Sequence, residues 1–325
     1  MNKHLLKALS LALITIASFG VPGLARADYP ERNLRIIVPI AAGSTTDYVA
    51  RALAEQLRIG LGQTIVIDNI AGAGGTIGTA AAFRAAPDGY TLLIASSAHT
   101  VNPVIYSALP YNTTADFSGI SVLVTLPNVL LTSPAKNIPT VEALVALGRK
   151  QTKDLSYGSG GVGSGAHMNA ELFRTAAKME AVHIPYKGTP EVVNALIAGD
   201  IDFAFVPITT ALPFIRNGKL TALAVGSAKR TPLLPDVPTT EEAGVPGSAH
   251  NEWIGLYTRA GTQPNIVRRL NLEVTKVLKS PAMNERLLTV GATPAPTTPE
   301  ETDAYVKAGI ATITKTVKLA KIPVN

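Results

Sequence analysis

Two loops rich in glycine and hydroxyl side chains carry the residues best suited to binding a small anion. The first spans 39–47 and the second 158–167, and neither contains lysine or arginine. Small side chains let backbone N–H groups approach a ligand closely, and a helix N-terminus behind each loop carries about half a positive charge. Further donors are the hydroxyls of Ser44, Thr45, Thr46, Ser159 and Ser164. An anion bound here would be held by dipoles and hydrogen bonds, without a full counter-charge.

The same loops also have a purely structural interpretation, in which their hydroxyl residues cap helices. This is the simpler interpretation for either loop alone, but two such loops at equivalent positions in two similar halves favour a shared cleft. Asp47 stands where a helix N-cap belongs, so we expect it to cap the helix and fix the loop rather than contact an anion. His167 is expected in the first turn of a helix, where it could equally bind a ligand or cap its loop.

Other groups capable of chemistry lack the surroundings that their reactions need. The segment 72–78 is glycine-rich and follows a strand, but its spacing departs from a dinucleotide fingerprint, so a structural turn is favoured. The histidines belong to no HExxH motif, and Ser164 lacks the spacing of a nucleophile elbow. The chain has no cysteine. We therefore expect no metal, no cofactor and no catalysis, with a hydrolase using Ser164 and His167 as the weaker alternative.

Strands alternating with helices place both loops in the same structural context. The predicted strands are 34–38, 64–68 and 91–95 in the first half and 155–157, 181–185, 201–206 and 220–225 in the second. Such alternation predicts parallel sheets built from βαβ units, in which ligands bind at the carboxyl ends of the strands. The segments 120–131 and 252–257 are expected to cross between the halves. Three late helices are expected to pack on the first half: 264–278, 282–288 and 300–320.

The N-terminal segment has the pattern of a secretory signal peptide. Lys3 and Lys7 precede a short apolar run, and a small-x-small site predicts cleavage after Ala27. The formal net charge of +6 includes both lysines and Arg26, basic residues elsewhere are scattered, and aromatic residues make up only 5% of the chain. A nucleic-acid partner is therefore not expected.

Taken together, several motifs identify a family resemblance that runs through nearly the whole chain after residue 27. The motifs that carry the resemblance are Val38-Pro39-Ile40-Ala41-Ala42-Gly43-Ser44-Thr45-Thr46-Asp47, Gly74-Gly75-Thr76-Ile77-Gly78, Ala86-Pro87-Asp88-Gly89-Tyr90-Thr91-Leu92-Leu93, the block 158–173, Ile184-Pro185-Tyr186-Lys187-Gly188, Ala222-Leu223-Ala224-Val225, Pro235-Asp236-Val237-Pro238-Thr239, Glu242-Ala243-Gly244, Trp253-Ile254-Gly255-Leu256 and Ala260-Gly261-Thr262. Through these motifs the chain resembles the Bug-type, TctC-like periplasmic solute-binding receptors of tripartite tricarboxylate transporters.

The resemblance implies an α/β fold of the type II periplasmic-binding-protein (Venus-flytrap) kind, with two lobes and two crossing strands. Residues 28–125 and 250–325 would form a discontinuous first lobe and residues 126–249 the second. The ligand would be a dicarboxylate, acidic amino acid, tricarboxylate or aromatic acid. The expected contacts are Ile40, Ala41, Gly43, Ser44, Thr45, Thr46, His99, Ser159, Gly160, Gly161, Gly163, Ser164 and His167.

The resemblance also implies a partner and a compartment. We expect a monomer in the periplasm that delivers its ligand to a two-component membrane permease, or alternatively to a sensor kinase. The family commonly has an aromatic residue where this chain has Ile40 and proline where it has Ala41. These departures leave the identity of the carboxylate open.

Overall fold

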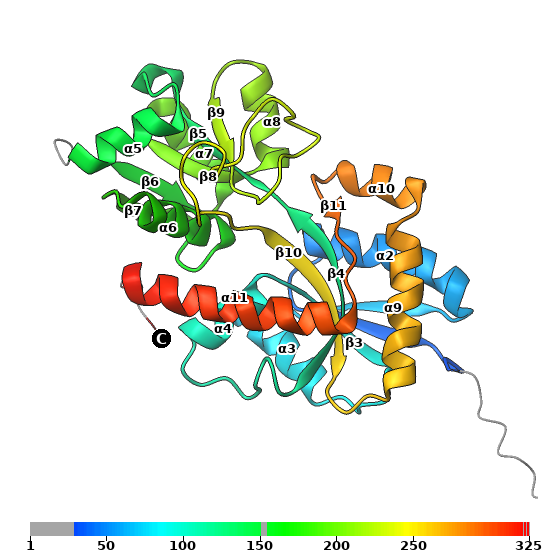
Figure 1. The fold of residues 1–325 in the computed structure, drawn as a ribbon. Coiled ribbons are helices and arrows are strands. Elements are labelled where there is room, and N and C mark those ends of the chain that lie inside the picture. The colour runs from blue at the N-terminus through cyan, green and yellow to red at the C-terminus, as the bar shows by residue number, and fades with distance from the viewer. Residues whose placement is uncertain (1–28, 151–154, 321, 323, 325) are drawn as a thin grey trace, which may run out of the picture.

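The computed structural model describes residues 29–150, 155–320, 322 and 324. The predicted signal peptide and its cleavage site therefore lie outside the described residues. In the described part the chain forms two α/β lobes, each built around its own sheet (Figure 1).

The first lobe contains a six-stranded sheet in the order β11-β4-β10-β3-β1-β2. β1 pairs in parallel with β2 and β3, as expected for βαβ units, whereas β10 pairs antiparallel with both β3 and β4. Four of these strands come from the beginning of the chain and two from its end. Their bounds are β1 Leu34–Val38, β2 Ile65–Asn69, β3 Thr91–Ser96, β4 Phe117–Leu126, β10 Glu252–Arg259 and β11 Thr293–Pro294.

The second lobe contains a five-stranded sheet in the order β7-β6-β8-β5-β9. β6 pairs in parallel with β7 and β8, and β5 enters antiparallel between β8 and β9. The bounds are β5 Asn128–Thr132, β6 Ser156–Ser159, β7 Val182–Pro185, β8 Phe203–Pro207 and β9 Thr221–Val225. In each sheet three parallel strands lie at one end, and an antiparallel strand, β10 in the first lobe and β5 in the second, pairs with the innermost of them.

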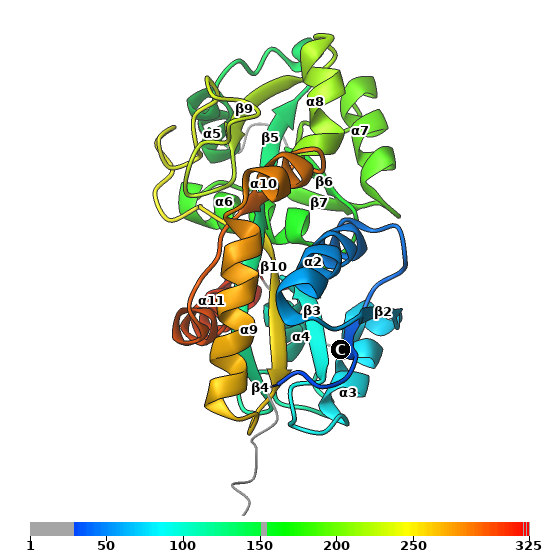
Figure 2. The same ribbon diagram turned by 90° about the vertical axis from the view of Figure 1, so that its right-hand side faces the viewer.

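Helices cover both sheets. In the first lobe they are α2 Thr45–Leu61, η1 Ala73–Gly75, α3 Thr76–Phe83, α4 Ala98–Ile105, α9 Pro264–Leu278, α10 Pro281–Leu288 and α11 Pro299–Ala320. In the second lobe they are η2 Pro134–Lys136, α5 Val141–Lys150, α6 Gly165–Ala177, α7 Thr189–Ala198 and α8 Ile208–Arg216. Figure 2 shows α2 and α9 beside the crossing strand β10. Among the described helices, none combines the length and apolar character that a membrane crossing requires.

Separate hydrophobic cores stabilise the two lobes. Leu53 and Leu57 of α2 pack with Leu270 of α9 and the strands of the first sheet, and all three side chains are fully buried. In the second lobe, Phe173 of α6 and Phe203 of β8 form the corresponding core. Burying side chains of this size contributes about 1.5–3 kcal/mol each. Each lobe therefore has a hydrophobic core of its own.

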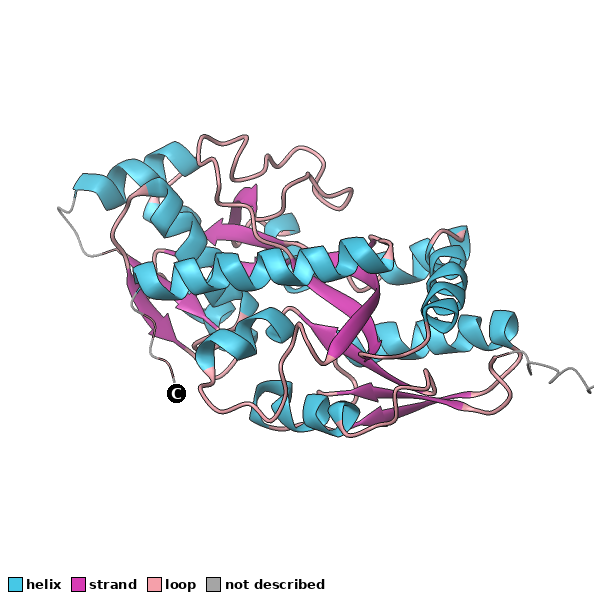
Figure 3. Ribbon diagram, turned by 60° about the horizontal axis from the view of Figure 1, so that its bottom comes forward, coloured by secondary structure: helices cyan, strands magenta, loops and turns pink. Residues whose placement is uncertain are grey.

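The two lobes are connected by crossing strands and also by a contact between helices. β4 ends at Leu126 and β5 starts at Asn128, so one residue separates the two sheets. Helix α11 was expected to pack on the first lobe only, but it also contacts α6 of the second. Figure 3 shows this long helix running across the molecule. Its Ile313 and Val317 share a buried cluster with Met168 of α6, because the apolar stripe of this long helix extends past the edge of the first lobe.

Candidate functional site

A cavity of about 530 Å³ lies where loops of the two lobes meet. The first lobe contributes residues from 39–46, 71–79 and 95–102, and the second contributes residues from 160–165. The lobes are in contact here, because a Cβ atom placed on Gly163 would stand 2.9 Å from Ile105 Cδ1 of α4. The cavity thus lies at the carboxyl ends of the parallel strands, where open α/β sheets bind ligands.

Four helix N-termini converge on this cavity. Its wall includes Thr46 at the start of α2, Gly75 before α3, Ser97 before α4 and Ser164 before α6. The N-termini of α3 and α4 have no side-chain cap. Their starts are held instead by the backbone, since the Thr76 N–H donates to the Ala73 carbonyl and the Thr100 N–H donates to the Ser97 carbonyl. No lysine or arginine is found among the described residues that line the cavity. The helix N-termini favour an anion through their oriented dipoles.

The N-cap of α2 is Ser44 rather than Asp47, which corrects the sequence-based expectation. The helix begins at Thr45, and the Ser44 hydroxyl accepts the backbone N–H of Asp47 at 3.2 Å. Asp47 lies in the first turn, where its carboxylate accepts the N–H of Gly43 at 2.9 Å and so closes the loop from the other side. The loop and the cap form one reciprocal unit, similar to a capping box.

Asp47 is buried, yet its pKa is lowered. Burial alone would raise the pKa, but hydrogen bonds from Arg51, from the backbone of Gly43 and from Asn69 outweigh it. The Arg51 Nε and Asn69 Nδ2 atoms lie 3.0 and 2.9 Å from the carboxylate. This side chain is therefore an anion with its own partners and holds the loop without facing the ligand.

The second loop repeats the same construction. The Ser164 hydroxyl caps α6 by accepting the N–H of His167 at 3.2 Å, and the Gly163 N–H donates to His167 Nδ1 at 3.1 Å. Since Nδ1 accepts, the proton of this imidazole is placed on Nε2. The pKa of His167 is lowered to about 4, mainly by burial and further by His183 beside it. The two rings stack with centroids 4.1 Å apart. His167 is thus a neutral cap of the loop.

The predicted contact residues divide into those that line the cavity and those that shape the loops. Ile40, Thr46, His99, Gly160, Gly163 and Ser164 line it. Ala41, Gly43, Ser44, Thr45, Ser159, Gly161 and His167 are outside its wall. Ser159 is fully buried beneath the second loop and lies 2.7 Å from His183 Nε2. In this second group, five residues use their hydroxyl, imidazole or N–H groups to fix the turns: Gly43, Ser44, Ser159, Gly161 and His167.

His99 is the one histidine among the described residues that line this cavity. It packs against Tyr257, with ring centroids 4.6 Å apart, and burial lowers its pKa to about 4. Its Nε2 atom has no hydrogen-bond partner among the described residues. A neutral, rigidly packed imidazole with a free nitrogen can bind a polar group of a ligand without adding charge.

Several cavity residues were missed by the sequence analysis. The glycine-rich segment 72–78, interpreted as a structural turn, forms part of the wall through residues 72–75, and residues 95–98 form another part. Both follow a strand and precede a helix, so the rule that identified the first two loops applies to them as well. Asn102, whose Nδ2 donates to the Gly74 carbonyl at 3.0 Å, holds this wall in place.

Glu252 was also missed, and it is the one acidic residue among the described residues that line the cavity. It is the first residue of β10 and lies at the junction of the lobes. Burial raises the pKa of its carboxyl group, opposed by a hydrogen bond from Asn128. Its only sequence signal is an acidic residue directly before the apolar run of a crossing strand.

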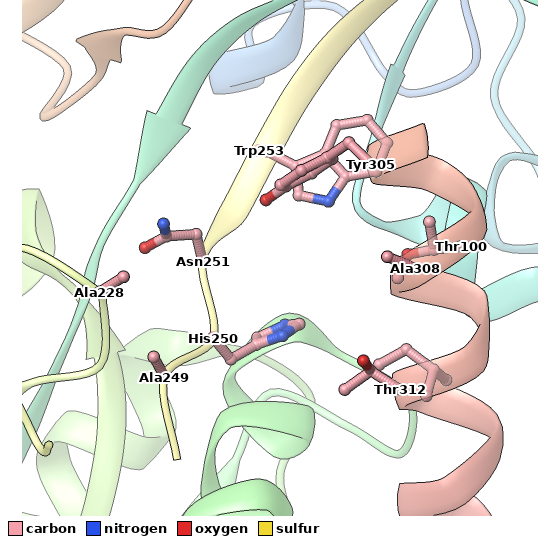
Figure 4. Close-up of a pocket in the computed structure, with 11 residues that line it drawn as sticks. Thr100, Ala228, Ala249, His250, Asn251, Trp253, Tyr305, Ala308 and Thr312 are labelled. Atoms are coloured by element: carbon pink, nitrogen blue, oxygen red, sulfur yellow. The ribbon is translucent and has the colours of Figure 1, made fainter. Parts of the chain in front are cut away.

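A second, smaller cavity of about 280 Å³ lies between the segment 249–251 and α11. Figure 4 shows His250 reaching toward Thr312 of α11, with Trp253 and Tyr305 at the other end. The Trp253 and Tyr305 rings meet edge to face with centroids 5.5 Å apart. Among the described residues that line this cavity, Thr100 of α4 is the one that comes from the first turn of a helix. This cavity is therefore a packing gap at the junction of the lobes rather than the candidate ligand site.

Comparisons with known proteins agree with this architecture. The Bordetella pertussis protein BugT is 35% identical over 306 residues, which cover 93% of this chain and 94% of that protein. The structure of R. palustris Rpa4515 with adipate is 32% identical, has a TM-score of 0.76 and covers 92% of this chain and 100% of the other. MatC from Rhodopseudomonas palustris with bound malate is 31% identical, with a TM-score of 0.70 and coverage of 89% and 100%.

The family model described as tripartite tricarboxylate transporter family receptor matches residues 49–319, which include every cavity segment except 39–46. The two-lobe fold, the paired loops and these relatives are consistent with one another. The chain belongs to the TctC family of tripartite tricarboxylate transporter receptors.

Proposed function

We propose that this protein captures a small organic carboxylate in the cavity between its lobes and releases it to a two-component membrane permease. The observation that carries the proposal is the convergence of four helix N-termini on a cavity whose described wall has no basic side chain. Adipate and malate, which two similar structures hold, are both small carboxylates. The protein would act as a receptor and not as an enzyme.

The magnitudes support capture by dipoles alone. Micromolar affinity requires about 8 kcal/mol. A hydrogen bond to a charged group contributes about 1.5–3 kcal/mol, and a helix N-terminus adds about 0.3–2 kcal/mol. Contacts to several of the four N-termini therefore reach this affinity after the costs of association are subtracted.

Binding is proposed to drive closure of the lobes. The ligand first contacts the first lobe, which supplies three of the four N-termini, and then the 160–165 loop of the second. Closure follows because the closed form binds the ligand more tightly. In this proposal residues 28–125 and 250–325 form the first lobe and residues 126–249 the second. The protein acts as a monomer in the periplasm after cleavage following Ala27.

A thermal-shift screen tests this function. Adipate, malate and other small carboxylates are compared with the corresponding neutral amides at equal concentration. Binding to the folded state raises the unfolding temperature by mass action, so the true ligand class is expected to stabilise the protein and its amides are not. Equal stabilisation by the amides would contradict binding of the negative charge by helix dipoles. If no carboxylate raised the unfolding temperature, the proposed function would be wrong.

A further inference from the structure

The position of Glu252 bears on which carboxylates the cavity accepts. Its side chain lies against Gly165, the first residue of α6, so closely that a Cβ atom on that glycine would collide with the carboxylate. The carboxylate thus stands beside one of the four helix N-termini that make the cavity attractive to anions. A ligand that enters the cavity shares this space with a protein carboxylate.

Glu252 has few partners of its own. Asn128 Nδ2 lies 3.3 Å from its Oε1, and the same nitrogen also lies 3.2 Å from Asn169 Oδ1. No basic side chain is paired with Glu252 among the described residues, whereas Asp47 has Arg51 and Glu171 has Arg174. A carboxylate has about four lone-pair sites, so most of the accepting capacity of Glu252 is unused. Burial raises the pKa of Glu252, and a cationic donor beside it would offset this effect by stabilising the ionised form.

We infer that Glu252 makes this receptor select carboxylates that also carry an ammonium group over otherwise identical carboxylates without one. The helix N-termini bind the carboxylate of such a ligand, and Glu252 accepts hydrogen bonds from its ammonium group. A plain dicarboxylate gains the first interaction but offers Glu252 no cationic donor. The inference rests on the proposed function and narrows its ligand class to amino-substituted carboxylates.

Succinate, malate and aspartate provide a direct test, because they differ only in the group on the second carbon. Affinities are measured by isothermal titration calorimetry on the full mature chain, and the same comparison is made with the five-carbon and six-carbon homologues. One hydrogen bond to a charged group corresponds to about tenfold or more in affinity. At the chain length that fits best, we expect the amino acid to bind at least about tenfold more tightly than the unsubstituted diacid of the same length. The affinity of the corresponding hydroxy acid should lie between the two.

Glu252→Gln is the decisive variant because it keeps the size of the side chain and an acceptor for Asn128 while removing the charge. The preference for the amino acid is expected to fall to less than about threefold, with a gain in affinity for the plain diacid. Glu273→Gln is the matched control. Glu273 is also buried, pairs with Arg269 on α9 and does not line the cavity. This control is expected to leave the preference unchanged.

The outcomes separate the two proposals. If the wild-type protein binds the plain diacid as tightly as the amino acid, or if Glu252→Gln leaves their ratio unchanged, the role assigned to Glu252 is wrong and carboxylate capture stands. If the wild-type protein binds no member of any series, the proposed function and the inference both fail. If the Glu252→Gln protein does not fold, the comparison of amino acid, hydroxy acid and plain diacid on the wild-type protein still decides the ligand class.

Discussion

Replacing Asp47 by asparagine tests whether the first loop is held by a buried, ionised carboxylate. One oxygen, Oδ2, accepts from Gly43 N and Arg51 Nε, and the other, Oδ1, accepts from Asn69 Nδ2. An asparagine has only one acceptor oxygen, so its NH₂ group must face a donor. Asn69 cannot turn over to compensate, because it also donates to the Ile40 carbonyl and accepts from Arg51.

The expected cost follows from these contacts. Losing a buried hydrogen bond to a charged group costs about 1.5–3 kcal/mol. The ion pair with Arg51 adds less than about 1 kcal/mol, because the Arg51 side chain is 53% exposed and solvent screens the pair. We expect Asp47→Asn to lower the free energy of unfolding by about 2–3 kcal/mol, measured by urea denaturation at pH 7. Carboxylate affinity should fall as well, because Ile40 and Thr46 of the same loop line the cavity.

The pH dependence gives the sharper result. The pKa of Asp47 is lowered in the folded protein, so its stabilisation is complete above the unfolded value of about 3.9 and is lost as the pH falls through the folded pKa. The stability difference between wild type and Asp47→Asn should therefore be constant from pH 7 to about 5 and shrink below pH 4. A difference that stays constant at pH 3 would refute this reasoning.

Asp68→Asn is the matched control for this experiment. Asp68 lies on the neighbouring strand β2 and pairs with Arg35, but its side chain is 36% exposed. Exposed pairs contribute about 0–1 kcal/mol, so this variant should cost less than half as much as Asp47→Asn. Equal costs for the two variants would mean that burial of Asp47 adds nothing.

Two further predictions concern how the loops are fixed. Ser44→Ala and Ser164→Ala should each lower the free energy of unfolding by about 1 kcal/mol, whereas glycine at either position should lower it by only a few tenths of a kcal/mol, because glycine is a much better N-cap than alanine. Urea denaturation of the four variants checks this prediction. Equal costs for alanine and glycine would contradict the capping roles. Gly78→Ala should cost about 1–3 kcal/mol in the same assay, because its Cβ would stand 2.5 Å from the Ile70 carbonyl oxygen and 2.7 Å from Pro39 Cα, both of which are backbone atoms.

Most of the fold could be predicted because the hydrophobic pattern of each element agrees with its tertiary environment. The segment 264–278 was predicted as a helix and forms α9 with the same bounds, since it is amphipathic and starts with a proline at the first helical position. Helices α4 and α8 were not predicted. Both are short and contain an internal proline, Pro103 and Pro213, which breaks the local pattern although tertiary packing still stabilises the helix.

The candidate site could be predicted only in part. Sequence pattern identified which turns approach the ligand, because a strand, a small-residue loop and a helix in that order have a fixed geometry. It could not show which polar groups remain free to bind a ligand. Ser159 is hydrogen-bonded to His183, which is distant in sequence, and His167 accepts the N–H of Gly163, a contact that depends on the curvature of the loop. The contribution of Glu252 depends on the meeting of two lobes, for which the sequence of one strand contains no signal.

Recognition through helix N-termini has a consequence for how specificity is achieved. Backbone N–H groups are the same for every residue type, so the loops need only be small and well capped, and they attract any carboxylate of suitable size. Discrimination must then come from the few polar side chains that reach the cavity, among them Thr46, His99, Asn102 and Glu252. Substitution at these positions should therefore change which carboxylate is bound, whereas substitution at the capping residues should weaken binding of all of them to a similar degree.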